Sequence, residues 1–126
     1  MDDRRRPVIL VLEDEADLAA TCARLLRRRG HAVIVAGSRA AALRALADAT
    51  PSALVCDVLL PDGDGLDVVR AAASMRQPVP AMVITARASE TGRVAATAAG
   101  AMAYLPKPFT ADSFVSHVDR ILVDRA

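Results

Sequence analysis

Five short apolar runs recur along the chain, and each is followed by a longer segment with apolar residues at helical spacing. The runs at 8–12 and 81–85 are continuous and rich in β-branched and aliphatic side chains, which is typical of strands buried on both faces. Three further runs cover 31–36, 53–58 and 102–105. The pattern therefore predicts five strands that alternate with five helices.

The segments between the runs carry start and stop signals for helices. Asp14 or Asp17 is expected to cap the first helix, and Gly30 to end it. Ser38 is expected to cap the second helix, which Thr50-Pro51-Ser52 ends. The remaining helices are predicted at 66–75, 90–99 and 111–123.

Strict alternation of strands and helices predicts an α/β fold, with a parallel sheet, helices on both faces and right-handed crossovers. The 126 residues suit one domain. We place that domain at 7–124 and expect the charged residues 1–6 to form a disordered tail. In such a sheet, ligands bind at the carboxyl ends of the strands.

Composition narrows the classes of function. The hydrophobic fraction of 53% indicates a folding chain, and the net charge of +1 gives no support for nucleic-acid binding by this chain itself. Cys22 and Cys56 lie in apolar segments and are interpreted as core residues in a reducing compartment. No apolar run reaches the length of a membrane span, so we expect a cytoplasmic location and no membrane partner.

Five polar residues fall at the predicted strand ends and should meet at one edge: Glu13, Asp14, Asp57, Thr85 and Lys107. Three carboxylates this close require a cation, and hard oxygen ligands suit Mg²⁺, with Mn²⁺ as an alternative ion. A carboxylate beside Mg²⁺ can act as a nucleophile on phosphorus, which makes Asp57 a candidate phosphoacceptor. Thr85 and Lys107, the only lysine in the chain, can neutralise the charge of the transferring oxygens.

Four motifs in order carry a resemblance to a known family: Val-Leu-Glu-Asp-Glu at 11–15, Asp-Val-Leu-Leu-Pro-Asp-Gly-Asp-Gly at 57–65, Ile-Thr-Ala at 84–86 and Tyr-Leu-Pro-Lys-Pro-Phe at 104–109. From Pro7 to the last helix, the chain resembles the receiver domain of the bacterial response-regulator family. The resemblance implies the flavodoxin-like, CheY-like fold, a single (βα)5 domain with a five-stranded parallel sheet in the order 2-1-3-4-5.

The resemblance also implies a role for each site residue. Asp57 is implied as the phosphoacceptor, and Mg²⁺ is implied to bind Glu13, Asp14, Asp57 and the backbone carbonyl of Leu59. Thr85 is implied to bind the phosphoryl group and Lys107 to pair with it. Tyr104 is implied as an aromatic switch that fills the space vacated when Thr85 moves, and the peptide bond between Lys107 and Pro108 is implied to be cis.

The implied partners are a sensor histidine kinase or a histidine phosphotransfer protein, which supplies the phosphoryl group from a phosphohistidine. A downstream protein is implied to bind the face formed by the fourth helix, the fifth strand and the last helix. Two other interpretations stay open: a degenerate receiver that acts as a constitutive binding module, and a small Mg²⁺-dependent phosphohydrolase. The chain either acts alone or is part of a longer regulator or hybrid kinase.

Several residues receive simpler interpretations. Asp62 and Asp64 each precede a glycine and are predicted to form turns rather than bind metal. His31 and His117 are predicted at the surface or at an edge, and not as phosphohistidines. In the family, Leu59 and Arg87 correspond to positions that help set the lifetime of the phosphoryl group. The apolar segment 100–103 departs from the acidic residues of many dimerising members, which puts such a dimer in doubt.

Overall fold

The computed structural model describes residues 6–124, so the predicted tail lies outside the described residues except for the exposed Arg6. Five parallel strands form the main sheet: β1 (Val8–Leu12), β2 (Ala32–Ala36), β3 (Ala53–Asp57), β6 (Ala81–Thr85) and β7 (Ala103–Pro106). The five helices are α1 (Ala16–Arg28), α2 (Arg39–Ala49), α3 (Leu66–Ala73), α4 (Glu90–Ala99) and α5 (Ala111–Asp124). The strand order is β2-β1-β3-β6-β7, which confirms the predicted topology.

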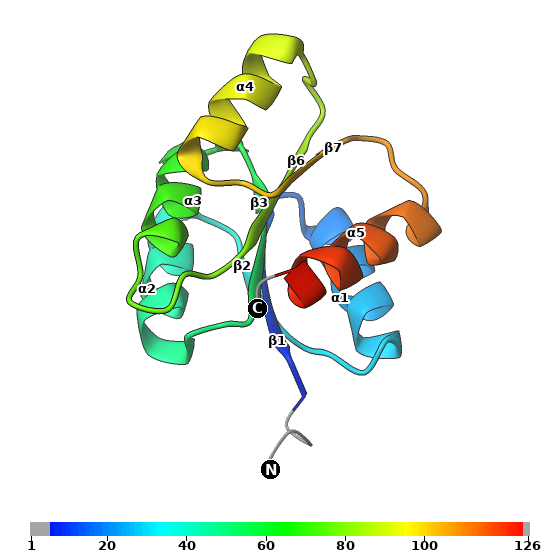
Figure 1. Ribbon diagram of the computed structural model, residues 1–126. Helices are drawn as coiled ribbons and strands as arrows, with labels where there is room; N and C mark the ends of the chain where they lie inside the picture. Colours follow the sequence, from blue (N-terminus) through cyan, green and yellow to red (C-terminus); the bar gives the residue numbers. More distant parts are fainter. Residues whose placement is uncertain (1–5, 125–126) are drawn as a thin grey trace.

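Helices cover both faces of the sheet (Figure 1). One apolar core lies between the sheet and α2, α3 and α4, and a second lies between the sheet and α1 and α5. Every residue of β3 and β6 is buried, which explains why these runs are continuously apolar rather than alternating. The long aliphatic side chains of the three central strands therefore serve both cores.

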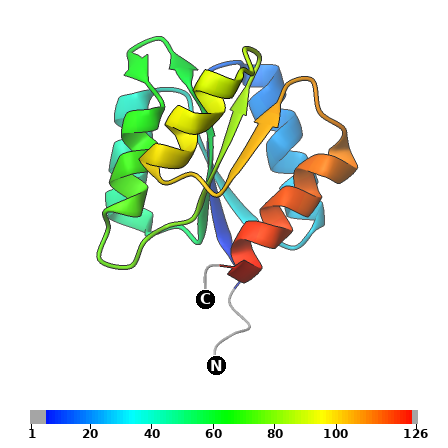
Figure 2. The ribbon, with the colours of Figure 1, turned by 45° about the horizontal axis from the view of Figure 1, so that its top comes forward.

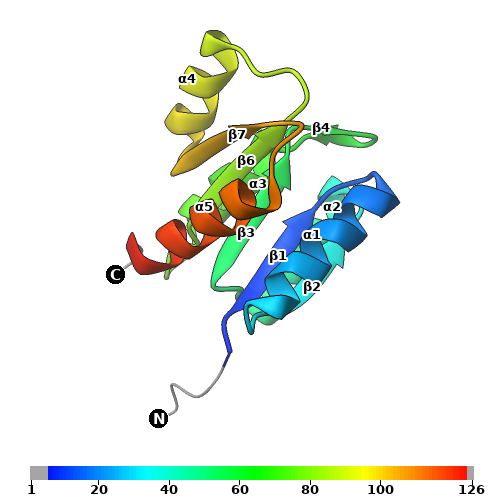
Figure 3. The same ribbon diagram turned by 90° about the vertical axis from the view of Figure 1, so that its right-hand side faces the viewer.

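The register of the sheet aligns the carboxyl ends of the strands. Leu12 pairs with Cys56, Asp57 pairs with Ile84, and Thr85 pairs with Pro106. The loops that follow β1, β3, β6 and β7 therefore lie at one end of the domain, opposite the beginning of β1 and the end of α5 (Figure 3). The predicted polar residues lie on or directly after these strand ends.

The helix boundaries follow the sequence signals, but the N-cap of α1 and the end of α3 differ, and α5 extends one residue beyond the predicted end, to Asp124. The Ser38 side chain accepts a hydrogen bond from the Ala41 N–H, as predicted for an N-cap. The prediction that Asp14 or Asp17 caps α1 is wrong, because Glu15 is the N-cap and makes no side-chain capping bond. The third helix ends at Ala73, two residues before the predicted end.

A small antiparallel hairpin follows Asp57 and was not predicted. It consists of β4 (Leu59–Leu60) and β5 (Gly63–Asp64), seen at the upper left of Figure 2. Asp62 lies in its turn, as predicted, but it also accepts hydrogen bonds from the backbone N–H groups of Arg39 and Ala40 at 2.8 and 3.1 Å. These bonds give partners to two backbone N–H groups in the first turn of α2, and they hold the pKa of Asp62 below its usual range. The loop after Asp57 is thereby tied to α2.

His31, predicted at the surface or at an edge, directly precedes β2 at the edge of the sheet. Its side chain is buried, and its Nε2 atom lies 3.8 Å from Asp119 of α5, because the turn after α1 packs under that helix. His117 is half-buried on α5, where its Nδ1 atom lies 2.7 Å from the Ser113 carbonyl oxygen. Among the described residues, none of the helices has the length and apolar character needed to span a bilayer.

Candidate functional site

Asp57 ends the central strand β3 with its side chain largely buried. One carboxylate oxygen accepts a hydrogen bond from the Leu59 N–H at 3.2 Å, and the other accepts one from Lys107 Nζ at 3.1 Å. The carboxylate is therefore held by a backbone amide on one side and an ammonium on the other. This arrangement orients a potential nucleophile toward the loops at the carboxyl end of the sheet.

Three carboxylates converge at this strand end. Glu13, Asp14 and Asp57 each offer an oxygen, and these oxygens lie within 4.8 Å of one another. The Glu13 side chain is only 1% exposed, whereas Asp14 is open to solvent. A cluster that combines buried and exposed carboxylate oxygens fits a hard divalent cation that keeps some of its water, which is the coordination that Mg²⁺ prefers.

The Glu13 carboxylate is oriented by two further contacts. It accepts a hydrogen bond from Lys107 Nζ at 2.7 Å and another from the Glu15 N–H at 3.0 Å. Burial raises the pKa of Glu13, since desolvation outweighs the lowering effect of these two bonds, and the Asp57 charge adds to the increase. A cation at the cluster would relieve this cost.

Lys107 bridges Glu13 and Asp57 from the loop that follows β7. Burial alone would lower the pKa of Lys107, but the hydrogen bonds to the two carboxylates more than offset that effect, so the pKa is raised. Its backbone N–H donates to the Thr85 carbonyl at 2.8 Å, and the peptide bond between Lys107 and Pro108 is cis. The ammonium is thus positioned from an anchored backbone.

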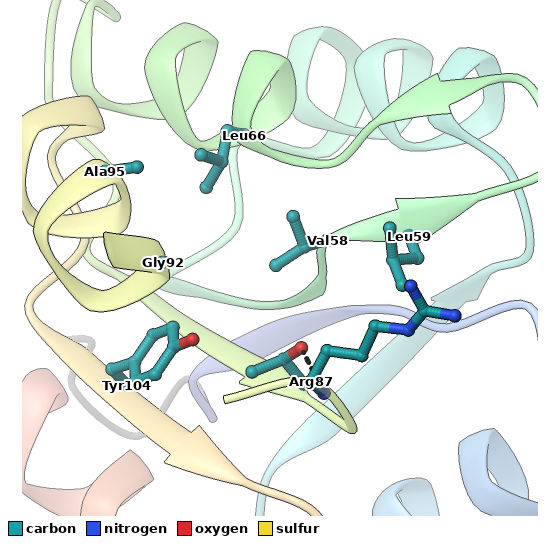
Figure 4. A pocket seen from close by; sticks show the side chains of 8 residues that line it. Val58, Leu59, Leu66, Arg87, Gly92, Ala95 and Tyr104 are labelled. Atoms are coloured by element: carbon teal, nitrogen blue, oxygen red, sulfur yellow. Dashed lines mark hydrogen bonds between the residues drawn. The ribbon is translucent and has the colours of Figure 1, made fainter. Parts of the chain in front are cut away.

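Thr85 lies at the end of β6 with its side chain buried. Its hydroxyl oxygen accepts a hydrogen bond from the Arg87 N–H at 3.0 Å. The Arg87 side chain extends from this loop toward Leu59 (Figure 4), a residue that is 55% exposed. Leu59 and Arg87 therefore line the same cavity as Thr85.

A cavity of about 240 Å³ separates this part of the site from α4. It is lined by Val58, Leu59, Leu66, Thr85, Arg87, Gly92, Ala95 and Tyr104. The ring of Tyr104 points into it beneath the first turns of α4 (Figure 4). Thr85 and Tyr104, predicted to act together, therefore face the same space, while the predicted movement of Tyr104 stays a prediction.

Gly65 is a residue of the site that the sequence reasoning treated only as part of a turn. A Cβ atom built there would lie 2.0 Å from the Asp57 carbonyl oxygen, and the Gly65 N–H donates to the Val58 carbonyl at 2.7 Å. The backbone of the loop thus passes directly against the backbone of Asp57. Glycine between turn residues was the one available signal, but it does not specify a close approach.

Comparisons of the sequence with protein families and with individual proteins point to the same family. A family model for the response regulator receiver domain matches residues 9–119. The transcriptional regulatory protein PrrA of Mycobacterium tuberculosis is 40% identical over 116 residues, which is 92% of this chain and 50% of PrrA. The response regulator MprA of Mycobacterium avium is 39% identical over 114 residues, or 90% of this chain and 50% of MprA.

Among solved structures, a CheY-like receiver domain protein from Methanospirillum hungatei superimposes with a TM-score of 0.91 at 22% identity. The match covers 96% of this chain and 97% of that protein, and at this identity it supports the fold alone. The chain spans about half the length of PrrA and MprA, so their similarity concerns only the part that matches.

Proposed function

Because the chain belongs to the response regulator receiver domain family, we propose that Asp57 accepts a phosphoryl group from a phosphohistidine and that the change in charge alters a partner-binding surface. The observation that carries this proposal is the contact of Lys107 Nζ with both Asp57 and Glu13. The donor is a sensor histidine kinase or a histidine phosphotransfer protein.

Glu13, Asp14 and Asp57, with the Leu59 carbonyl, would hold Mg²⁺. The support for this assignment is the set of carboxylate oxygens within 4.8 Å of one another and the burial cost of the Glu13 charge. When bound, the ion would neutralise charge on the phosphoryl oxygens and hold them near the nucleophile. Each carboxylate oxygen has two lone pairs, so Glu13 and Asp57 can keep Lys107 as a donor while binding the ion.

In the transfer step, a carboxylate oxygen of Asp57 forms the new bond to phosphorus while the bond from phosphorus to the donor imidazole nitrogen breaks. The electron pair of that bond stays with the imidazole nitrogen, which takes a proton from solvent water to become neutral histidine. Lys107 neutralises part of the charge on the phosphoryl oxygens, and the Thr85 hydroxyl donates to one of them. For this, the Thr85 hydroxyl must reorient from its contact with the Arg87 N–H.

The proposed output is a shift between two states of the face formed by α4, β7 and α5. Phosphorylation replaces the single negative charge of the Asp57 carboxylate with a phosphoryl group that carries about −1.5 to −2 charges. Movement of Thr85 toward that charge would change the cavity that it shares with Tyr104, so the position of the ring and the surface above it would change together. A downstream protein would bind one state better than the other.

A small phosphoramidate donor tests this function. With Mg²⁺ present, we expect uptake to stop near one phosphoryl group per protein, because the product stays on Asp57 until slow hydrolysis. Donor consumption and protein-bound phosphate are measured together. Continued consumption at many equivalents per minute, together with hydrolysis of unrelated phosphoesters, would instead indicate a phosphohydrolase.

The same reaction with Asp14→Asn tests the metal. Removal of one ligand charge should raise the Mg²⁺ concentration needed for half-maximal rate by about tenfold or more. Asp17→Asn is the matched control, since Asp17 is also exposed but lies in the first turn of α1 and outside the carboxylate cluster. Equal Mg²⁺ dependence in Asp14→Asn and the wild type would remove Asp14 from the metal site.

A further inference from the structure

The phenol of Tyr104 lies against the first turn of α4, and this contact requires that residue 92 has no side chain. The Tyr104 hydroxyl oxygen accepts a hydrogen bond from the Ser89 N–H at 3.3 Å. Ser89 is the N-cap of α4, and its side chain accepts from the Gly92 N–H at 2.9 Å. A Cβ atom built at Gly92 would lie 2.7 Å from the Tyr104 hydroxyl oxygen. The phenol thus occupies the space that any side chain at position 92 would need.

The backbone provides no other reason for glycine at this position. Gly92 lies within α4, and its φ angle is not in the left-handed region, in contrast to Gly100 at the end of the same helix. Glycine inside a helix is less favourable than alanine because it loses more backbone entropy on folding. Gly92 therefore makes the helix less stable than alanine would, and its contribution is the space that it leaves for the Tyr104 hydroxyl.

We propose that Gly92 is a positioning residue for Tyr104. Because Gly92 has no side chain, it leaves a space on α4, which we call the seat, and the phenol occupies it. This contact connects β7 to α4 beside the cavity that Thr85 lines. Gly92, Tyr104 and Thr85 line the same cavity, and Gly92 lies above the ring of Tyr104 (Figure 4). A change at Thr85 can reach the ring through that space, and the ring can pass it to α4 through the Ser89 N–H and the surface of Gly92.

Gly92→Ala tests the seat directly. The atom nearest to the new methyl group is the far end of the Tyr104 side chain, and the next is Ser89 Oγ at 3.1 Å, which needs to give by only a few tenths of an ångström. We therefore expect the ring to move while the protein stays folded. Tyr104 is the only tyrosine and the chain has no tryptophan, so the ring signals in an NMR spectrum and the ultraviolet fluorescence report on this one residue. Both should shift in Gly92→Ala relative to the wild type.

Thr91→Ala is the matched control, because Thr91 is an exposed neighbour in the same turn of α4 and the substitution also favours the helix. We expect it to leave the tyrosine signals unchanged. Tyr104→Phe supplies a second test, since the Tyr104 Cζ atom is 3.6 Å from the built Cβ atom, an ordinary contact. The contact with Ser89 Oγ at 3.1 Å is the same in both backgrounds, so the change in melting temperature caused by Gly92→Ala should be more favourable in the Tyr104→Phe background than in the wild type.

Unchanged tyrosine signals in Gly92→Ala would overturn the proposal, and so would equal changes in melting temperature in the two backgrounds. A last measurement rests on the proposed function: phosphorylation should shift the tyrosine signals less in Gly92→Ala than in the wild type, and an equal shift would contradict the role in coupling. If the wild type takes up no phosphoryl group, the proposed function fails, while the results for the resting protein still decide the role of Gly92.

Discussion

Gly65→Ala is expected to lower the free energy of unfolding by about 3 kcal/mol or more, at the upper end of the cost of overpacking. The new Cβ atom would lie 2.0 Å from the Asp57 carbonyl oxygen and 3.0 Å from Cys56 Sγ. The nearest atom belongs to the backbone of a buried strand and cannot rotate away, so the loop from Val58 to Gly65 must move. Urea denaturation measures the loss.

The same substitution should also impair the acceptor. A displacement of about 1 Å at reacting groups can cost on the order of a hundredfold in rate. We therefore expect Gly65→Ala to take up the phosphoryl group at least about a hundredfold more slowly under conditions in which it stays folded. Gly37→Ala is the matched control, because no heavy atom lies within 4 Å of the built Cβ atom and its φ angle is not left-handed.

Gly37→Ala should change the free energy of unfolding by less than about 1 kcal/mol and leave phosphoryl uptake unaltered. If Gly65→Ala is as stable as Gly37→Ala, the close passage of the loop against Asp57 is not a feature of the folded protein. If it is unstable but accepts phosphate at the normal rate, the loop does not help to position the carboxylate.

Lys107→Met is expected to destabilise the protein by about 3 kcal/mol in the absence of Mg²⁺, the cost of removing one partner from a buried ion pair. The ammonium contacts Glu13 and Asp57 at 2.7 and 3.1 Å, and the side chains of all three residues are at most 16% exposed. Methionine keeps the aliphatic length and removes the ammonium group, with its charge and its two hydrogen bonds. Mg²⁺ should restore part of the lost stability, because the ion would neutralise the same carboxylates.

The pH dependence of this difference follows from two pKa shifts. The pKa of Lys107 is raised above its ordinary value of 10.5, so its contribution is complete below that pH and is lost as the pH rises through the raised value. Glu13 also has a raised pKa, because of its burial. As the pH falls through that pKa, Glu13 takes up a proton and no longer needs a cation. The stability difference between wild type and Lys107→Met should therefore be level from neutral pH to about 10.5, shrink as the pH rises further, and shrink as the pH falls through the pKa of Glu13.

Arg24→Met controls for the loss of a positive charge, since Arg24 is exposed on α1. We expect Lys107→Met to accept the phosphoryl group and to respond to it weakly, as judged by spectral changes in α4 and α5. A normal response would show that Lys107 is not needed to convert phosphorylation into a change of surface, and equal stability of the two variants would contradict the ion-pair account.

The main sheet and its helices were predictable because buried parallel strands leave a strong sequence signal. The runs at 81–85 and 90–99 match β6 and α4 at both ends. The hairpin formed by β4 and β5 left no comparable signal, because each strand has only two residues and neither alternates between a buried and an exposed face. Loop structure of this length is decided by tertiary contacts, here the bonds from α2 to Asp62.

For the candidate site, the residues could be predicted from the sequence pattern, but their roles could not. Its residues could be chosen because the carboxyl ends of parallel strands meet at one edge, and the structure brings Glu13, Asp14, Asp57 and Lys107 together. Their roles come from the resemblance and remain predictions until they are tested.

Contacts that depend on three-dimensional packing could not be anticipated. The seat for Tyr104 at Gly92 and the burial of His31 depend on which side chains meet across elements, and no local pattern encodes that. For the same reason, the sequence predicted Asp14 or Asp17 as the cap of α1. The N-cap is instead Glu15, whose backbone N–H donates a hydrogen bond to the Glu13 side chain.

The central claim is that Asp57 is the phosphoacceptor, and the mass of the intact protein after incubation with acetyl phosphate and Mg²⁺ tests it most directly. We predict one added phosphoryl group on the wild type and none on Asp57→Asn. Asp62→Asn should still accept the group, because Asp62 is a neighbouring carboxylate that contacts α2 rather than Lys107. An adduct that persists in Asp57→Asn, or no adduct on the wild type with either acetyl phosphate or a phosphohistidine donor, would contradict the account.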